Sequence, residues 1–224
     1  MTVSIVIPIY KPLSLLSEFE AASLRQVLKV CPTRQLVLVC PDDLDVSAYL
    51  TIHQFETKRF AKENFESVKT YNKLCQKADF YRAFDTDYIL LYQLDAWIFE
   101  DKIDYFVEKG FDYIGSPHQD YIHQGLVVGN GGFSLRKCAA FINVCEQTDF
   151  TQCRQTWEDI VFTNDCADML SIADLDTAYE FGWQQLPARH MSRLGKLPMG
   201  THSPNKYSDW AFWSNYINIH EYDN

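Results

Sequence analysis

The sequence predicts an α/β domain with a mostly parallel sheet flanked by helices. Three apolar runs of strand length lie at residues 3–7, 36–40 and 88–92, and turn residues or acids follow each of them. Residues 14–30 separate the first two runs and carry apolar side chains at helical spacing. Continuous apolar strands are typical of a sheet covered on both faces, and strand–helix–strand alternation indicates parallel strands with right-handed crossovers.

The rest of the chain shows weaker periodicity, but turn and capping residues still divide it into elements. The other expected elements are, in chain order, a strand at 51–55, mainly helix over 58–84, a helix at 102–109, a strand at 113–115, a loop at 116–125, a glycine-interrupted strand at 126–135, a helix at 136–147, a helix that starts at Thr156 as N-cap, and an irregular tail from 195 onward.

The length and composition of the chain indicate a single hydrophobic core. A chain of 224 residues with 47% hydrophobic content can bury one core well and is short for two, so we expect a single domain over 1–224. No apolar run approaches the length of a membrane-spanning helix, and the chain opens directly into a strand rather than a secretory signal. Seven cysteines without CxxC spacing favour reduced, buried thiols over a metal cluster. These features predict a cytoplasmic protein without a transmembrane segment.

The charge narrows the class of partner. A net charge of -10 argues against nucleic acid, because binding to a phosphate backbone requires a basic surface. It does not argue against a nucleotide held through a divalent cation, since the cation can bridge an acidic protein and an acidic ligand.

The most informative acid is Asp95, which follows the apolar run at 88–92. Ligands of open α/β sheets bind outside the carboxyl ends of the strands, so Asp95 is expected to face a binding crevice and to hold Mg²⁺ or Mn²⁺. The literal Asp-x-Asp motif, Asp85 to Asp87, precedes the same run. It is therefore expected at the opposite edge of the sheet, in a solvated turn.

The segment 129–132, Gly-Asn-Gly-Gly, is the second candidate feature. Gly131 and Gly132 allow a backbone to approach a ligand closely, so we expect them to line a sugar or acceptor pocket. A tight turn or β-bulge is the alternative. Neither a P-loop nor a dinucleotide fingerprint is present, because the spacing and the Lys-Ser/Thr pair are absent.

Glu158 and Asp159 open a predicted helix, and two interpretations remain open for them. Acids at a helix N-terminus stabilise it through capping and the macrodipole. An acid that points into a pocket can instead deprotonate an attacking hydroxyl, provided that it lies within about 3 Å of that hydroxyl. His202 lies in a late loop, either as a surface residue or as a ligand to a metal or diphosphate. His118 and His123 are weaker candidates for such a ligand.

Seven segments in order resemble one known group of enzymes. They are residues 6–12 (VIPIYKP), 71–74 (YNKL), 92–97 (YQLDAW), 112–115 (DYIG), 129–136 (GNGGFSLR), 157–159 (WED) and 181–183 (FGW). Together they resemble the GT-A nucleotide-sugar glycosyltransferases, specifically a bacterial family of formerly unknown function related to the family-2 enzymes. The resemblance implies one Rossmann-like domain with a mixed sheet, a nucleotide-binding half over about 1–100 and an acceptor half over about 101–224.

The resemblance also implies roles for single residues. Asp95 takes the place of the last acid of the metal motif, Asp159 that of the base of an inverting enzyme, and His202 that of a late metal-binding histidine. Gln93 stands where many relatives have Asp, which weakens the metal site and leaves metal-independent transfer open. The residues that would border the nucleotide or sugar are Pro8, Tyr10, Asp42 or Asp43, and Asn72; candidate helpers without metal are Lys73, Arg82 and Arg136.

We therefore expect an inverting glycosyltransferase that moves a sugar from a nucleoside diphosphate sugar to a saccharide acceptor, in cell-surface polysaccharide synthesis. Peripheral membrane association and a divalent cation cofactor remain open. The alternative is a catalytically silent nucleotide-sugar or glycan-binding domain. A glycoside hydrolase is disfavoured, because a strand-exit acid in a βαβ unit suits a nucleotide better than a glycan cleft with paired acids.

Overall fold

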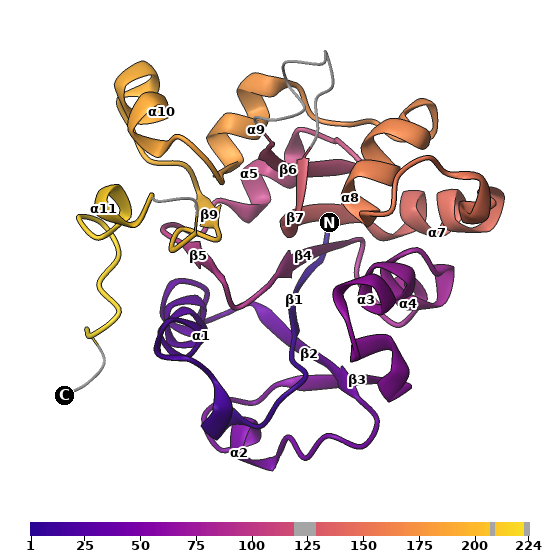
Figure 1. Cartoon of the computed structure of the whole chain (residues 1–224), viewed down its shortest axis with the longest axis horizontal. Coiled ribbons are helices and arrows are strands. Elements are labelled where there is room, and N and C mark those ends of the chain that lie inside the picture. The colour runs from indigo at the N-terminus through magenta and orange to yellow at the C-terminus, as the bar shows by residue number, and fades with distance from the viewer. Residues whose placement is uncertain (119–128, 207–208, 222–224) are drawn as a thin grey trace.

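Six strands form one mixed sheet in the order β3-β2-β1-β4-β7-β6 (Figure 1). The computed structural model describes residues 1–118, 129–206 and 209–221. β1 to β4 run parallel to one another, and β7 lies antiparallel between β4 and β6. The strands are β1 (Val3–Pro8), β2 (Gln35–Pro41), β3 (Glu56–Phe60), β4 (Tyr88–Tyr92), β6 (Tyr113–Pro117) and β7 (Gly129–Lys137). The predicted α/β class and mostly parallel sheet are confirmed.

A second, three-stranded sheet carries the late part of the chain back to the strand-exit edge. It consists of β5 (Ala96–Ile98), β9 (Gly200–His202) and β8 (Gly182–Trp183), with β9 in the centre. Ala96 pairs with His202 in the antiparallel β5–β9 ladder. Because β5 directly follows Asp95, this pairing places His202 beside Asp95, which lies 107 residues earlier in the sequence.

The helices cover both faces of the large sheet. In Figure 1, α1 lies on one side of the sheet and α3, α4 and α7 lie on the other. The α-helices are α1 (Glu18–Val30), α2 (Ser47–Leu50), α3 (Val68–Cys75), α4 (Ala78–Arg82), α5 (Ile103–Glu108), α7 (Cys138–Gln147), α8 (Glu158–Ile160), α9 (Leu175–Phe181), α10 (Pro187–Leu194) and α11 (Trp210–Trp213). Short 3₁₀ turns occur at Leu13–Leu15, Lys62–Phe65, Phe150–Gln152 and Ala167–Met169, and a π-helix at Val161–Asp165 follows α8.

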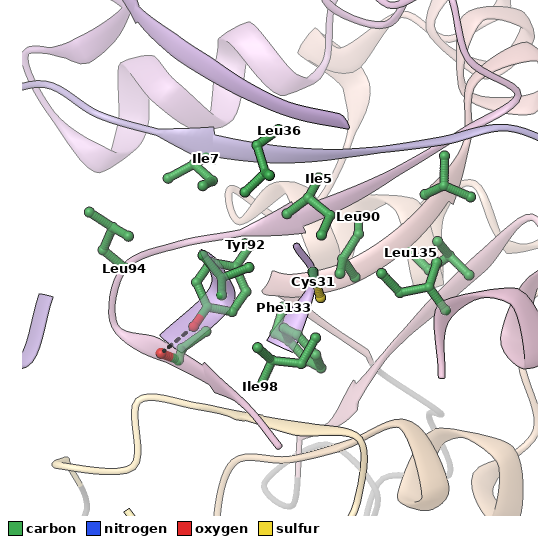
Figure 2. Close-up of a cluster of buried hydrophobic side chains, with 14 of the residues drawn as sticks. Ile5, Ile7, Cys31, Leu36, Leu90, Tyr92, Leu94, Ile98, Phe133 and Leu135 are labelled. Atoms are coloured by element: carbon green, nitrogen blue, oxygen red, sulfur yellow. Dashed lines mark hydrogen bonds between the residues drawn. The ribbon is translucent and has the colours of Figure 1, made fainter. Parts of the chain in front are cut away.

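The first hydrophobic layer lies between the sheet and α1. Ile5, Leu36 and Leu90 point into it from three neighbouring strands (Figure 2). α1 begins with a capping box, in which Ser17 and Glu20 satisfy each other's backbone N–H groups. Tyr92 reaches α1 through its hydroxyl, which lies 2.8 Å from the Ser23 hydroxyl. This contact fixes the end of β4 against the helix.

The second layer lies on the opposite face. The alternate strand residues Val6, Val37 and Ile89 pack there against an aromatic cluster from α3, α4 and α7. Within it the rings of Tyr81 and Phe141 lie 4.9 Å apart. Since successive side chains of a strand point to opposite faces, the continuous apolar runs supply both layers at once.

The strand predicted at 51–55 is wrong, whereas most of 58–84 is helical as predicted, at Lys62–Phe65 and in α3 and α4. Residues 51–55 form turns, and the strand is β3, at Glu56–Phe60. This edge strand carries mainly polar, half-buried side chains, so no apolar run in the sequence indicates it. The α-helical part begins at α3, where Ser67 is the N-cap, and breaks before α4.

The second half differs from prediction at three element boundaries. β7 continues through Lys137, so the helix expected from 136 begins at Cys138. Trp157, rather than Thr156, is the N-cap of α8, and no side chain caps this helix. The tail expected to be irregular contains β9 and α11. Residues 119–128, which include His123, lie outside the described part of the chain.

The described residues agree with the expectation of reduced thiols. All seven cysteines are free, and five of them are buried. Burial raises the pKa of Cys31 and of Cys138 to about 12 in each case. No helix over residues 1–118, 129–206 and 209–221 combines the length and the apolar character needed to cross a bilayer.

Arg34 ties the loop before β2 to the start of α5. Its guanidinium donates to both oxygens of Asp101 at 2.8 and 2.9 Å and to both oxygens of Asp104 at 2.8 and 2.9 Å. We expect Arg34→Met to lower the free energy of unfolding by about 1–2 kcal/mol, because bidentate charge-assisted bonds to the partly buried Asp101 and the exposed Asp104 are lost. Chemical denaturation of both proteins at pH 7 measures this; equal midpoints and slopes would contradict it.

Candidate functional site

A cavity of about 580 Å³ opens at the carboxyl edge of β1 and β4. This volume lies in the range of small-ligand sites, and the position is the strand-exit edge predicted for a ligand. Its lining comes from five parts of the chain: Pro8 to Lys11 after β1; Leu16, Ser17, Phe19 and Glu20 at the start of α1; Phe65, Ser67, Val68, Tyr71 and Asn72 around α3; Gln93 to Asp95 after β4; and Asn205 and Lys206 after β9.

Four of the predicted nucleotide-site residues meet at this cavity. Pro8, Tyr10, Asn72 and Gln93 all line it, and the Tyr10 side chain is 59% exposed. Asn72 is buried, and its amide nitrogen lies 3.5 Å from the carbonyl oxygen of Thr156, just before α8. The cavity wall is therefore joined to the segment that carries Glu158 and Asp159.

Other predicted residues lie outside the lining. Asp42 and Asp43 are exposed beyond the end of β2, and Asp43 lies 3.4 Å from the Lys62 ammonium. Lys73 is exposed on α3. Arg82, a candidate helper, is an exposed residue of α4 that pairs with Asp79 and Glu146.

Asp95 lies in a tight turn between β4 and β5, at the mouth of the cavity. The turn closes where the Ala96 N–H donates to the Gln93 carbonyl at 2.8 Å. One Asp95 oxygen lies 3.1 Å from His202 Nε2, and the other accepts from Lys206 Nζ and from Ser203 Oγ, each at 2.8 Å. As expected, the literal motif lies at the opposite edge, where Asp87 binds the Thr2 N–H and hydroxyl groups.

The surroundings of Asp95 favour its ionised form. Burial acts to raise the pKa of Asp95, but the charge and hydrogen bond of His202, together with those of Lys206, outweigh it. The pKa therefore lies well below the usual range of an aspartate. The carboxylate is charged throughout the physiological range.

Gln93, Asp95 and His202 form the candidate metal site. Gln93 Oε1 lies 3.3 Å from His202 Nε2, which is also the imidazole atom nearest Asp95. Carboxylate oxygen, amide oxygen and imidazole nitrogen are a donor set that suits Mn²⁺ or Mg²⁺. Among the described residues, no group of three or more His, Cys, Asp or Glu side chains is arranged to hold a metal ion. The site therefore depends on the amide of Gln93 as its third donor.

Two residues of this cluster were not found from the sequence. Ser203 adopts a positive φ of 51°, rare for a residue other than glycine, and its N–H donates to the Asp95 carbonyl at 2.8 Å. Lys206 places an ammonium group on the cavity wall. In the sequence, only their closeness to His202 distinguishes these two residues. The pairing of β5 with β9 brings the loop that carries them, which follows β9, to Asp95.

The glycine segment forms a bulge in β7. The β6–β7 register shifts between the pairs Gly115–Ser134 and Pro117–Gly129, so that several β7 residues face one β6 residue. A Cβ atom on Gly132 would overlap His202 and lie 2.6 Å from Gln93 Oε1, while one on Gly131 would overlap Glu158. Neither glycine lines the cavity directly. Of the two alternatives, the bulge is thus present, and it lies between Gln93 and His202 on one side and Glu158 and Arg136 on the other.

Glu158 and Asp159 have different environments. Glu158 is 5% exposed, and its Oε1 accepts from a guanidinium nitrogen of the fully buried Arg136 at 2.7 Å. Burial raises the pKa of Glu158 while the Arg136 charge opposes the shift. Since arginine stays protonated and cannot be buried without a counter-charge, we assign a charged pair. Glu158 and Arg136 are therefore paired with each other and lie outside the cavity lining, which does not support a direct role on a ligand for either of them.

Asp159 is partly exposed and lies against the glycine bulge. Its Oδ2 accepts from the Gly131 N–H at 3.0 Å, and its Oδ1 accepts from the Ile160 N–H at 2.8 Å. Asp159 thus approaches Gly131, whereas Gln93 and His202, the neighbours of Asp95, approach Gly132. Only Asp95 belongs to the cavity lining, so the structure brings the two acids to one edge of the sheet without placing both in the same cavity.

Replacement of Asp95 with asparagine should destabilise the fold in a pH-dependent way. Because the folded-state pKa is depressed, the carboxylate stabilises the protein fully above its unfolded pKa of about 3.9, and this contribution is lost as the pH falls toward the folded pKa. We expect a difference in unfolding free energy of roughly 1–3 kcal/mol at pH 7 that shrinks below about pH 4. Denaturant unfolding of both proteins at pH 7, 5, 4 and 3.5 measures this difference in unfolding free energy. A difference that stays constant to pH 3.5 would refute the lowered pKa of Asp95 in the folded protein.

Comparison with solved structures identifies the fold. The galactosyltransferase LgtC, in complex with donor and acceptor sugar analogs, aligns with a TM-score of 0.60 at 11% identity over 94% of each chain. The glycosyltransferase GlyE of Streptococcus pneumoniae TIGR4 aligns with a TM-score of 0.57 at 11% identity, over 98% of this chain and 61% of GlyE. Mouse xyloside xylosyltransferase 1 aligns with a TM-score of 0.55 at 12% identity, over 90% and 97%. The predicted GT-A fold is thereby confirmed.

Sequence comparison gives a family. No curated protein sequence matches the chain. One family model, described as "Protein of unknown function (DUF5672)", matches residues 54–202. The matched range includes β3 to β9, the glycine bulge and the residues Gln93, Asp95, Arg136, Glu158, Asp159 and His202, but neither Ser203 nor Lys206. This match extends over more than half of the sequence, and the chain belongs to the DUF5672 family.

Proposed function

We propose that this protein is a glycosyltransferase that moves a sugar from a nucleoside diphosphate sugar to a saccharide acceptor, with inversion at the anomeric carbon. The observation that carries the proposal is the cavity at the carboxyl edge of β1 and β4, with Asp95 in its wall and Asp159 beside the adjoining glycine bulge. The GT-A fold of the similar structures, all of them glycosyltransferases by name, supports it.

In this proposal the nucleotide occupies the part of the cavity between β1 and α3. Tyr10 offers an exposed ring on which a base can stack, and Asn72 offers a buried amide for hydrogen bonds. The diphosphate then lies toward Asp95 and Lys206, where the cavity carries its exposed ammonium group. This direction places the sugar at the end nearest the glycine bulge.

A divalent cation fits the donor set of Asp95, His202 and Gln93. When bound, it would neutralise the charge that develops on the departing diphosphate. A bound cation would repel the Lys206 ammonium group, which lies on the other oxygen of the Asp95 carboxylate. Lys206 can then contact a diphosphate oxygen, because its flexible chain is 56% exposed and presents three donors.

Asp159 is the proposed base. It is partly exposed, and each carboxylate oxygen, which already accepts one backbone N–H, retains a lone pair for an incoming hydroxyl. Removal of the proton from the acceptor hydroxyl on the face opposite the diphosphate leads to inversion. Cell-surface polysaccharide synthesis in the cytoplasm, as the setting, is a proposal that follows from the family resemblance alone.

One observation favours the alternative of a silent binding domain. Asp95 is already paired with both Lys206 and His202, and Asp159 lies outside the cavity lining, so the structure also suits a protein that holds a nucleotide sugar without turnover. Micromolar nucleotide binding with neither hydrolysis nor transfer would favour this function.

A nucleotide-sugar panel tests the proposed activity. With UDP-, GDP-, CDP- and dTDP-sugars and Mn²⁺, one donor should be hydrolysed or transferred by the wild-type protein. We expect Asp159→Asn to lower turnover by about 10²–10⁴-fold through loss of the base, and Asp95→Ala by at least about 10²-fold through loss of charge compensation. Asp85→Asn, an exposed acid at the opposite sheet edge, is the control. Full activity of Asp159→Asn and Asp95→Ala would remove the assigned roles.

Lys206→Met should separate metal binding from binding of the nucleotide alone. Loss of the competing ammonium group frees Asp95, so the Mn²⁺ concentration for half-maximal stabilisation with UDP should fall roughly fivefold, as for an exposed pair worth about 1 kcal/mol. UDP without metal should stabilise this variant less than it stabilises the wild type. Thermal-shift titrations measure both, with Lys62→Met, which removes an exposed lysine paired with Asp43, as the matched control. Weaker Mn²⁺ binding in Lys206→Met would contradict the competition.

A further inference from the structure

The buried pair of Arg136 and Glu158 lies directly behind the proposed base. Arg136 is 0% exposed, and its three guanidinium nitrogens donate to four acceptors. They are Ser134 Oγ at 2.9 Å, the Tyr81 hydroxyl at 3.0 Å, the Gly131 carbonyl at 3.2 Å and Glu158 Oε1 at 2.7 Å. The guanidinium thus joins the glycine bulge of β7 to the start of α8.

Gly131 is held on both sides of its backbone. Its carbonyl accepts from Arg136 and, at 2.8 Å, from the Ser134 hydroxyl, while its N–H donates to Asp159 Oδ2 at 3.0 Å. With the carbonyl fixed by two donors, the orientation of this residue is fixed too. The Gly131 N–H group that donates to the Asp159 carboxylate is therefore held in a fixed position.

The chain around Asp159 is anchored at three further points. Glu158 is tied to Arg136, the Asp159 carbonyl accepts from Thr163 Oγ1 at 2.8 Å, and the Thr156 carbonyl faces the Asn72 amide at 3.5 Å. A π-helix begins at Val161, and such insertions are frequent at functional sites. These contacts fix the backbone on either side of a carboxylate that itself remains partly exposed.

We infer that Arg136 and Glu158 form a positioning pair that sets the direction of the Asp159 carboxylate through Gly131; this inference rests on the proposed function. A buried ion pair stabilises a fold no better than well-packed apolar side chains of similar volume, so stability alone gives no reason for it here. A geometric role does give a reason for the pair, since displacement of a general base by about 1 Å can lower the reaction rate about 10²-fold. The same pair explains why glycine is required at 131, where a Cβ would overlap Glu158.

The expected signature is a loss of turnover without a loss of donor binding. Glu158→Gln keeps the shape and a carbonyl acceptor but removes the charge that holds Arg136. We expect the turnover number for transfer to fall about 10–100-fold. The KM for the donor and the thermal shift with UDP should stay within twofold, because the cavity lining is untouched.

Two controls separate positioning from stability. Arg34→Met breaks a different, remote ion-pair cluster and should destabilise the protein with unchanged turnover. In the double variant of Glu158→Gln with Asp159→Asn, the losses should not multiply, since a carboxylate that is absent cannot be mispositioned. If Glu158→Gln does not fold, Ser134→Ala, which deletes one hydroxyl donor to Gly131, takes its place with a smaller expected loss of about 3–10-fold.

Several outcomes would overturn the inference. Turnover of Glu158→Gln within twofold of wild type, multiplicative losses in the double variant, or an equal loss in Arg34→Met would each do so. Inactivity of Asp159→Asn together with full activity of Glu158→Gln would refute the positioning pair and leave the proposed function intact. A crystal structure of Glu158→Gln in which Asp159 still accepts from the Gly131 N–H would refute it independently of any activity.

Discussion

Positions 131 and 132 of β7 have no room for a side chain, and this constraint organises the whole edge of the sheet. Gln93 and His202 approach Gly132 from one direction, and Glu158 with Arg136 approaches Gly131 from another. The Gln93 N–H also donates to the Gly132 carbonyl at 2.8 Å, which holds the turn of Asp95 against the bulge. The turn after β4, the start of α8 and the end of β9 can therefore converge here because β7 has no side chains at these two positions.

The fold was predictable where one strand supplies both hydrophobic layers. β1, β2 and β4 are continuous apolar runs because each packs against helices on two faces, and the structure places them close to the predicted residues. β3 was misplaced because an edge strand needs no such run, and its side chains are half-buried and polar. β8 and β9 were not predicted. These strands of two and three residues form because they pair with segments that are distant in the sequence, and the hydrophobic periodicity of the sequence carries no information on such pairing.

The candidate site was predictable to the extent that it follows from strand ends. Asp95, Pro8 and Tyr10 line the cavity because the ends of β1 and β4 place them at the same edge of the sheet. The functions of Glu158 and Asp159 could not be separated, because neighbouring acids at a helix start look alike in sequence, whereas one is buried against Arg136 and the other is partly exposed. Lys206 and Ser203 depend on the β5–β9 pairing, which only the folded chain reveals.

Gln93, where the family resemblance implies an aspartate, changes the charge of the candidate metal site but keeps an oxygen donor at this position. With one acid fewer, the cluster of Asp95, His202 and Lys206 carries one negative group against an ammonium group and an imidazole. A second carboxylate at 93 would lie within contact distance of His202 and near Asp95, so that a cation would be needed to offset two adjacent negative charges. With the amide, the lysine alone balances Asp95. In the proposed function, a site of this charge would bind a diphosphate either with a divalent cation or with Lys206 moved from the carboxylate to the phosphate.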